Sequence, residues 1–511
     1  MALIMLVLTG VLVAMLYHLL SSKTNAASLA TMEPPLLKSR IMSLDHLVGL
    51  LRSGAGYYAA CAQRSSSPIL TLEIFGRKTY VVKSPSLMAA CDRRAKTISF
   101  APFVVGYAKR LLSASPQALG LLSEDMSEER GSDCLRPATM QAMHKALKPG
   151  KDLDELTASF ISHLSSCLDQ AAHELDSLKP LSMFKWVQNL VASASTDTMY
   201  GRDLNPMRAP GVMDAFWTVD GNLAWLGLDV IPSLIAPNSN RCRQRLFAAF
   251  REYYAVNGTK AAAHVIQERH RINTTHGVNN ADIAQFELGL LVALIINTRA
   301  ATFWTLFYIY SDETLLRNIR TVVEATVTPG NPRVVNLAHV IEKIPVVESL
   351  VQEVIRLQSN SISGRILLED VVIEDTDGHQ YLLKKDAFLA MPSMVVHHDD
   401  NIWGSMAKDF VPERFTSGFK RPRVPASSNR GFGGGNAICP GRHFATREII
   451  SILVMVAMRF DIRPCTGNWE HPKMFHRLSA SVTTPIDDIL IDIQPREGVT
   501  ETSWEFAWHT A

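Results

Sequence analysis

The sequence predicts a mainly α-helical protein with a minor β region, arranged as one large domain. Three observations support this prediction. Apolar and polar residues alternate over residues 68–83 on both sides of Gly76, which is typical of a β-hairpin. Helical patterns then dominate to about residue 360. Short strands and loops follow, until a last helix is predicted at residues 443–458 from apolar residues on a helical period.

Composition excludes several classes of protein. The chain has 511 residues, of which 47% are hydrophobic, enough to fill a large core. The net charge is +2 and no long basic run occurs, so nucleic-acid binding is not indicated. The seven cysteines are scattered and odd in number, without a Cys-x-x-Cys motif. This pattern argues against a disulfide framework or a zinc site and favours a reducing compartment.

The first residues form an uncharged apolar run. Residues 2–20 contain no Lys, Arg, Asp or Glu and are long enough to span a bilayer as a helix. A cleaved signal peptide would place a positive residue before a shorter apolar core, and none precedes this run. Lys23, Lys38 and Arg40 follow the run and favour a cytosolic domain. We therefore expect a transmembrane anchor at residues 1–22, a hinge at 23–45 and the large domain at 46–511.

Two apolar segments stand out in the helical part. The first, residues 216–232, contains Trp217 and Trp225. Ordinary core would explain it; alternatively, it forms the roof of a substrate channel that also dips into a membrane interface. The second, Phe286 to Tyr310, is apolar nearly all round, as in a helix buried in a large protein. Its polar insert, residues 297–299, needs partners or serves a site.

The most distinctive stretch is Phe432 to Arg442, Phe-Gly-Gly-Gly-Asn-Ala-Ile-Cys-Pro-Gly-Arg. The glycines let the backbone approach a flat, bulky group closely. Pro440 fits the first turn of a helix, so Cys439 is predicted at a helix N-terminus, where the dipole favours a thiolate. A thiolate held on such a loop is a good axial ligand for haem iron.

This stretch resembles the haem-binding loop of the cytochrome P450 family, Phe-Gly-Gly-Gly-x-x-x-Cys-Pro-Gly. Glu353 and Arg356 match the family's Glu-x-x-Arg, and residues 412–415 match its Pro-Glu-Arg-Phe. The Asn-Thr-x-x-Ala-Thr-Phe-Trp stretch that starts at Asn297 is similar to the branch containing cholesterol 7α-hydroxylase and prostacyclin synthase. The cysteine loop also resembles those of fungal biosynthetic members. The resemblance implies the P450 fold, with a single large haem domain behind the anchor.

The resemblance also implies roles for individual residues. Cys439 would be the axial ligand of haem iron, with Phe432 and Arg442 also binding the cofactor. Arg365 would bind a haem propionate. His144 or Lys145 is a further candidate, although a solvated helix face explains that pair about as well. His397 would either reach a propionate or hold a turn. Asn297, Thr298 and Thr302 would hydrogen-bond the oxygen being activated and relay protons to it. Glu353, Arg356 and Arg414 would form a buried charged cluster behind the cysteine loop.

The chain departs from the family in two places. It has no acid–alcohol pair in the helix that contains Asn297, and Ala437 stands where many members place Arg or His two residues before the cysteine. We expect a haem-thiolate monooxygenase that hydroxylates or epoxidises a lipophilic polycyclic substrate, a terpenoid or steroid-like intermediate of fungal secondary metabolism. The implied cofactors are haem b and NADPH through a separate reductase, at the endoplasmic reticulum membrane. The alternatives are a reductant-independent haem isomerase or dehydratase of the prostacyclin synthase type and a non-catalytic haem- or sterol-binding membrane protein.

Overall fold

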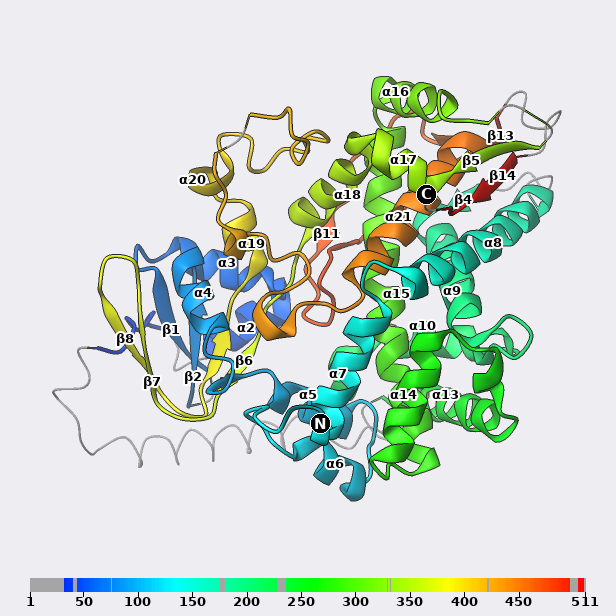
Figure 1. The fold of residues 1–511 in the computed structure, drawn as a ribbon. Helices are drawn as coiled ribbons and strands as arrows, with labels where there is room; N and C mark the ends of the chain where they lie inside the picture. The colour runs from blue at the N-terminus through cyan, green and yellow to red at the C-terminus, as the bar shows by residue number, and fades with distance from the viewer. Residues whose placement is uncertain are drawn as a thin grey trace, which may run out of the picture.

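A computed structural model describes residues 32–39, 44–74, 76–174, 180–227, 236–328, 330, 332–420, 422–496 and 504–509. The predicted anchor at residues 1–22 and most of the predicted hinge at 23–45 lie outside this part of the chain. Figure 1 shows two regions, a β-rich part on the left and a larger helical body on the right. The prediction of a mainly helical fold with a minor β region is therefore confirmed.

The helices and strands follow one another along the whole described chain. The helices are α2 (Leu44–Ser53), α3 (Gly56–Gln63), α4 (Pro85–Asp92), α5 (Ala101–Arg110), α6 (Pro116–Ser123), α7 (Leu135–Ala146), α8 (Lys151–Glu174), α9 (Met183–Tyr200), α10 (Val212–Gly221), α11 (Leu223–Gly227), α13 (Pro237–Ala255), α14 (His264–Thr275), α15 (Asn280–Tyr310), α16 (Glu313–Glu324), α17 (Leu337–Lys343), α18 (Pro345–Gln358), α19 (Ser393–His397), α20 (Asp400–Trp403) and α21 (Arg442–Arg459). The strands are β1 (Ile69–Ile74), β2 (Arg77–Val82), β3 (Ile98–Ser99), β4 (Leu181–Ser182), β5 (Arg333–Asn336), β6 (Arg365–Leu367), β7 (Val371–Glu374), β8 (Gln380–Leu383), β9 (Phe388–Ala390), β10 (Phe460–Pro464), β11 (Met474–Phe475), β12 (Thr484–Pro485), β13 (Leu490–Pro495) and β14 (Trp504–Ala507).

The predicted hairpin is formed by β1 and β2, which pair antiparallel from Ile69 with Val82 to Ile74 with Arg77. Gly76 in the turn has φ +72°, a conformation that a residue without a side chain adopts at no steric cost. The hairpin belongs to a five-stranded sheet with the order β1-β2-β9-β6-β3. Strand β6 begins at Arg365, so this sheet carries one of the predicted site residues toward the helical body.

Residues 33–37, in the middle of the predicted hinge, run along the edge of this sheet. The Thr71 N–H donates to the carbonyl of Pro35, and the Leu37 N–H donates to that of Thr71, both at 2.9 Å. Glu33 pairs with Lys78 on β2. The chain therefore enters the described domain beside β1 and β2.

Helix α15 is the central element of the helical body. It begins at Asn280, six residues before the predicted Phe286, because the Asn279 side chain caps its first turn by accepting from the Asp282 N–H. Within the described residues α15 is the one helix long and apolar enough to cross a membrane, and 78% of its most apolar window is buried inside the protein. The burial of α15 agrees with its prediction as a core helix.

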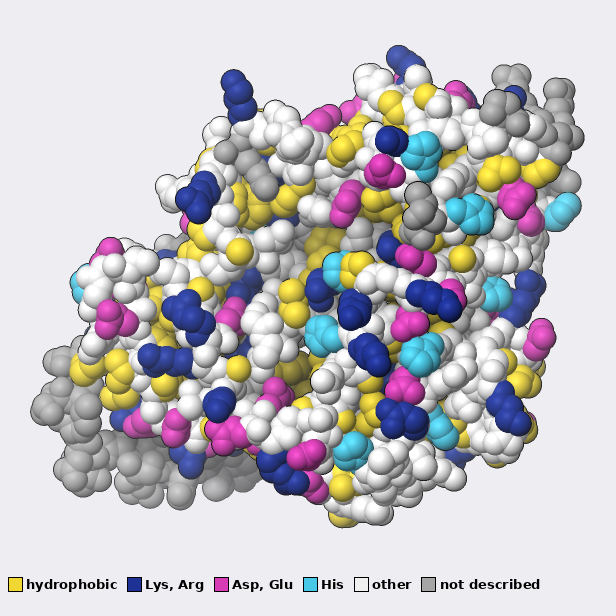
Figure 2. Space-filling view, viewed as in Figure 1, with side chains coloured by type: hydrophobic (Ala, Val, Ile, Leu, Met, Phe, Trp, Pro, Cys, Tyr) yellow, Lys and Arg dark blue, Asp and Glu magenta, His cyan; other side chains and the backbone are white. Residues whose placement is uncertain are grey.

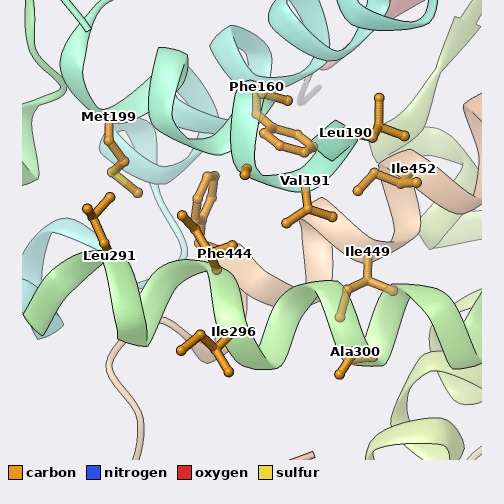
Figure 3. Packing of buried hydrophobic residues seen from close by; sticks show 14 of the residues in the cluster. Phe160, Leu190, Val191, Met199, Leu291, Ile296, Ala300, Phe444, Ile449 and Ile452 are labelled. Carbon is orange, nitrogen blue, oxygen red and sulfur yellow. The ribbon is translucent and has the colours of Figure 1, made fainter. Parts of the chain in front are cut away.

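Helix α21 packs against α15 and brings the cysteine loop to it. Phe444 and Ile449 of α21 belong to the same buried cluster as Ile296 and Ala300 of α15, and Figure 3 shows them along α15. The ring of Phe444 meets that of Phe160 on α8 edge-on at 6.0 Å. This dry contact fixes the first turns of α21, and the cysteine loop directly precedes them.

The face of the protein drawn in Figure 2 carries acidic and basic side chains interspersed, with histidines among them over α7 and the start of α21. Lys145, Lys148 and Lys151 are exposed on this part of the chain, and Arg442 and His443 are half-buried beside them. Several cations thus lie on the chain near the cysteine loop, among acidic side chains.

Candidate active site

The cysteine loop closes on itself before α21. The N–H of Cys439 donates to the carbonyl of Phe432 at 2.9 Å, and Nη1 of Arg442 donates to the carbonyl of Cys439 at 3.1 Å. Gly433 has φ +81°, and a Cβ there would lie 3.0 Å from the carbonyl oxygen of Ala437. The turn therefore requires glycine at position 433.

The environment of the Cys439 thiol acts in two directions. Burial is the largest effect and raises its pKa. The N–H groups of Gly441 and Arg442 and the positive charge of Arg442 lower it. The helix N-terminus thus favours the thiolate, as expected from the sequence, but in the protein alone it does not outweigh burial. A bound metal ion would deprotonate a coordinating thiol outright.

A cavity separates the cysteine loop from α15. One wall contains Phe432 and Cys439, and Asn297 and Thr298 of α15 also line the cavity. Arg365 is the fifth predicted site residue that lines the cavity. Small residues on both sides, among them Ala293, Ala301 and Gly433, leave the space between the walls open.

Arg365 is a buried cation at the wall of this cavity, with 3% of its surface exposed. Its guanidinium donates to the carbonyl of Gly364 at 2.8 Å and to that of Gly434 at 3.2 Å. The nearest carboxylate oxygen, Oδ1 of Asp92, is 3.8 Å from Nη2, beyond hydrogen-bond distance. Burial lowers the pKa of Arg365, and the charge of Asp92 opposes this effect. Arg365 therefore has no hydrogen-bonded carboxylate among the described residues.

The polar residues of α15 are held in defined orientations. Oδ1 of Asn297 accepts the backbone N–H of Ser481 at 2.7 Å. A backbone nitrogen can only donate, so the amide group of Asn297 is fixed with its NH₂ free to donate elsewhere. The Thr298 hydroxyl donates to the carbonyl of Leu294 at 2.9 Å and keeps its lone pairs available. Asn297 therefore offers a donor to the cavity and Thr298 offers an acceptor.

Three predicted site residues lie outside the lining of this cavity. Thr302 is fully buried one turn beyond Thr298, and its hydroxyl has no hydrogen-bond partner among the described residues. His144 on α7 is half-buried, and burial, together with the nearby charge of Arg442, lowers its pKa. Arg442 itself holds the Cys439 carbonyl from the end of α21. These three residues therefore do not form the walls of the cavity.

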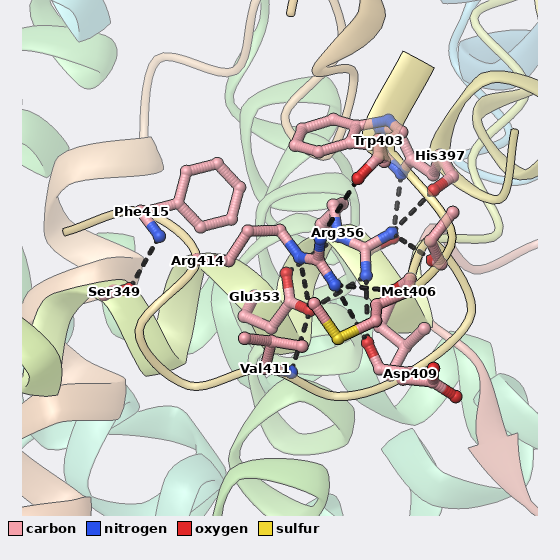
Figure 4. Close-up of polar contacts among 12 residues, drawn as sticks. Ser349, Glu353, Arg356, His397, Trp403, Met406, Asp409, Val411, Arg414 and Phe415 are labelled. Carbon is pink, nitrogen blue, oxygen red and sulfur yellow. Dashed lines mark hydrogen bonds and ion pairs between the residues drawn. The ribbon is translucent and has the colours of Figure 1, made fainter. Parts of the chain in front are cut away.

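The three predicted scaffold residues form one buried cluster (Figure 4). The Glu353 carboxylate accepts from Nε and Nη2 of Arg356 at 2.7 and 2.9 Å, and from Nε of Arg414 at 2.9 Å. No more than 1% of each side chain is exposed. The remaining guanidinium donors bind backbone carbonyls between residues 397 and 409. Two planar guanidinium groups thus hold an irregular loop in place.

His397 joins this cluster to the segment that leads into the cysteine loop. Its Nε2 accepts the N–H of Arg430 at 2.8 Å, so its Nδ1 carries the proton donated to the carbonyl of Arg356, also at 2.8 Å. Burial, assisted by the charge of Arg356, lowers the pKa of His397 to about 3. Both ring nitrogens are engaged by backbone groups, so His397 has the structural role that the sequence left open.

Arg430 and Asp92 are site residues that the sequence analysis missed. Nη1 of Arg430 donates to Oδ2 of Asp92 at 2.9 Å, and the Arg430 side chain is 1% exposed. A Cβ at Gly434 would lie 2.8 Å from Arg430, and one at Gly435 would lie 2.9 Å from Asp92. The glycine run therefore packs directly on this ion pair. No sequence signal connects the two residues, which are 338 positions apart.

The apolar segment at residues 216–232 divides between core and surface. Phe216 is fully buried, and Trp217 lies over the guanidinium of Arg299 at 4.7 Å. Arg299 pairs there with buried Asp220, so the third polar residue of the insert in α15 faces away from the cavity. Trp225 is 54% exposed. Residues 228–235 lie outside the described part of the chain.

These residues fit a haem. The cavity presents one cysteine sulfur for the iron, small residues against which a flat ring can lie, and a buried arginine whose nearest carboxylate, that of Asp92, is 3.8 Å away, so a propionate could hydrogen-bond to it. The fold and site therefore define a haem-thiolate protein. The Cytochrome P450 family model matches residues 58–491, and the chain belongs to this family.

Three similar proteins support the resemblance predicted from the sequence. Cytochrome P450 monooxygenase nodJ of Hypoxylon pulicicidum is 30% identical over 497 residues, covering 94% of this chain and 93% of that protein. A cytochrome P450 monooxygenase of Gibberella zeae is 25% identical over 495 residues, covering 93% and 91%. The cholesterol 7-alpha-monooxygenase of Cricetulus griseus is 23% identical over 372 residues, covering 66% and 72%. The chain is thus an oxidoreductase of the P450 monooxygenase class.

Proposed function

We propose that this enzyme hydroxylates or epoxidises a lipophilic polycyclic molecule, a terpenoid or steroid-like intermediate of fungal secondary metabolism. The observation that carries the proposal is the cavity between Cys439 and α15, whose walls are apolar apart from a few oriented polar groups. The likeness to fungal monooxygenases and to a cholesterol hydroxylase supports this substrate class. A bound haem b would supply the chemistry that activates dioxygen.

Each residue of the cavity has a proposed part in that reaction. Cys439 holds the iron, and Phe432 packs at the cofactor beside it. Arg365 binds a propionate. Asn297 donates from its amide to an oxygen atom in the cavity, and Thr298 accepts a proton at its hydroxyl oxygen. No carboxylate lines the cavity among the described residues, so protons arrive through water or hydroxyl groups rather than through an acid of α15.

The residues outside the cavity hold it in place. Glu353, Arg356 and Arg414 fix the loop behind the cysteine, and Arg442 fixes the Cys439 carbonyl. Thr302, one turn from Thr298, offers a second buried hydroxyl group that has no hydrogen-bond partner among the described residues. We propose that His144 lies near the edge of the cofactor, because the charge of nearby Arg442 acts on it.

The electrons come from NADPH through a separate cytochrome P450 reductase. The exposed Lys145, Lys148 and Lys151 of α7, the following turn and the start of α8 support docking of an acidic electron donor at the face drawn in Figure 2. The uncharged run at residues 2–20 supports a single-pass anchor in the endoplasmic reticulum membrane, with the catalytic domain in the cytosol.

A second candidate is a reductant-independent haem isomerase or dehydratase. The fixed amide donor of Asn297 favours it, because a donor without a proton-delivering acid suits the rearrangement of a bound oxygenated substrate. In this reading Asn297 orients a substrate oxygen, and no external electrons are consumed.

Metabolite profiling of a host strain under ¹⁸O₂ separates these functions. The full chain is compared with Cys439→Ala, which should accumulate the substrate. A product that carries ¹⁸O and is lost in the variant would support oxygen insertion. An unlabelled product with a rearranged skeleton would refute oxygen insertion and favour the isomerase.

A further inference from the structure

The last residue of α5, Arg110, lies where two hollows meet. The first hollow, the apolar compartment, has Phe100, Val104, Leu111, Leu223 and Leu478 among its lining residues, and Arg110 is the only charged one. Phe100 also lines the cavity that contains Cys439. The apolar compartment therefore borders the cavity at one end and reaches Arg110 at the other.

The second hollow, the basic groove, contains five cations and one acid: Arg77, Lys78, Arg110, Lys384, Lys385 and Asp386. Lys78 and Lys384 are paired with Glu33 and Asp370. Arg77, Arg110 and Lys385 have no acidic side-chain partner among the described residues, so the groove carries an unbalanced positive charge. Arg110 and Phe103 line both hollows.

The guanidinium of Arg110 is positioned by the helix that carries it. A Cβ at Gly106, one turn earlier, would lie 2.8 Å from its Nη2, so the side chain folds back over a position that has no side chain. Among the described residues its donors make no hydrogen bond or ion pair. Five donors at the mouth of an apolar compartment are thus available to a ligand.

The distance from the cavity to Arg110 can be taken from α5 itself. Phe100 is the N-cap of α5 and Arg110 its last residue, so at 1.5 Å per residue they are about 15 Å apart along the axis. The lining is mainly apolar, with Tyr107 and Ser479 as its other polar side chains, so a molecule that fills the compartment is expected to be mainly apolar over that length. The end of such a molecule farther from the cavity lies beside Arg110, which has no acidic partner among the described residues.

We propose that the substrate is an amphiphile whose apolar polycyclic body occupies the apolar compartment and whose anionic group, a carboxylate or another oxyanion, binds Arg110 at the edge of the basic groove. This inference rests on the proposed function and adds the chemical class of the substrate. Arginine suits the role because its planar fork matches an oxyanion with two parallel hydrogen bonds.

Haem-loaded full-length protein in neutral detergent tests the proposal by equilibrium dialysis. The probes are oleanolic acid, a polycyclic terpenoid carboxylic acid, and its uncharged methyl ester. Wild type should bind the acid more tightly than the ester by about twofold to fivefold, the size expected for an exposed ion pair. Arg110→Gln should abolish this preference by weakening the acid alone. Lys109→Gln is the matched control, because Lys109 is an exposed neighbour that lines neither hollow.

High salt should also reduce the preference, since it screens an exposed ion pair. Equal binding of acid and ester by wild type, binding of neither, or a preference that survives Arg110→Gln would each overturn the proposal. So would an effect of Arg110→Gln confined to sedimentation with phosphatidylserine vesicles, which would assign the groove to the membrane surface. The ¹⁸O experiment compares wild type with Cys439→Ala and uses no Arg110 variant, so the proposed function and this inference can fail separately.

Discussion

Glu353→Gln is the most informative change in the buried scaffold. The carboxylate of Glu353 accepts four hydrogen bonds, three from Arg356 and Arg414 and one from the N–H of Val411 at 3.1 Å. Glutamine has nearly the same shape, but its NH₂ group cannot accept the hydrogen bonds that a carboxylate oxygen accepts from these donors. The change therefore removes the only carboxylate between two guanidinium groups and leaves the packing otherwise intact.

The cost follows from the burial of all three side chains. Removing one partner of a buried charge cluster destabilises a protein by about 3–5 kcal/mol, because the remaining charges stay buried without compensation. For a chain of 511 residues, at about 2.1 cal/mol/K per residue, this corresponds to a melting temperature lower by about 3–5 °C. The loop at residues 397–409 should loosen first, since Arg356 and Arg414 hold its carbonyls.

Thermal unfolding of the haem-loaded full chain, followed by circular dichroism, measures this effect. Glu348→Gln is the matched control, because Glu348 lies on the same helix, is half-buried, and has Gln352 as its hydrogen-bond partner. We expect that control to shift stability by less than about 0.5 kcal/mol. Equal melting temperatures for Glu353→Gln and Glu348→Gln would refute the account of the scaffold.

Three further changes test other parts of the protein. Burial raises the pKa of Glu448 from 4.5 to about 8. Between these pH values the folded state retains a proton that the unfolded state releases, so the free energy of unfolding falls as pH rises. Glu448→Gln should abolish that fall, measured by urea unfolding at several pH values. Asn297→Ala removes the amide donor and should lower product formed per NADPH by at least about tenfold. Arg430→Lys loses the two-point contact with Asp92 and should weaken haem retention by about fivefold, measured by transfer of haem to apomyoglobin.

Each of these predictions has a contradicting result. A steep pH dependence that persists in Glu448→Gln would assign it to other groups. Thr305→Val is the control for Asn297→Ala, because its hydroxyl is buried, bound to the Ala301 carbonyl and outside the cavity lining; equal product yields in both would remove Asn297 from the reaction. Haem transfer from Arg430→Lys at the wild-type rate would remove the ion pair from the support of the cysteine loop.

Local patterns were sufficient to predict much of the fold. The alternation around Gly76 predicted the hairpin, and the helical period after Cys439 predicted α21 to within one residue at each end. The start of α15 was placed too late because its first turns are polar. The capping pair Asn279 and Asp282, which marks the true start, is a local signal that the apolar period obscured.

Contacts between distant segments could not be predicted in this way. Nothing in the chain indicates that Asp92 meets Arg430, or that Ser481 orients the amide of Asn297. The insert in α15 was predicted as one polar group, yet Arg299 faces Asp220 while Asn297 faces the cavity, since neighbouring residues on a helix point in different directions. For Cys439 the helix dipole was predictable, but the larger effect of burial depends on the packing.

The central claim is that Cys439 on the glycine loop binds haem iron as a thiolate. X-ray absorption at the iron edge of purified full-length protein tests it most directly, with Cys439→His as the variant that keeps a ligand at the position. We expect one sulfur atom bound to iron in the wild type, and nitrogen in its place in a variant that still retains haem. Iron without a sulfur neighbour in the wild type, or sulfur that persists in Cys439→His, would contradict the assignment.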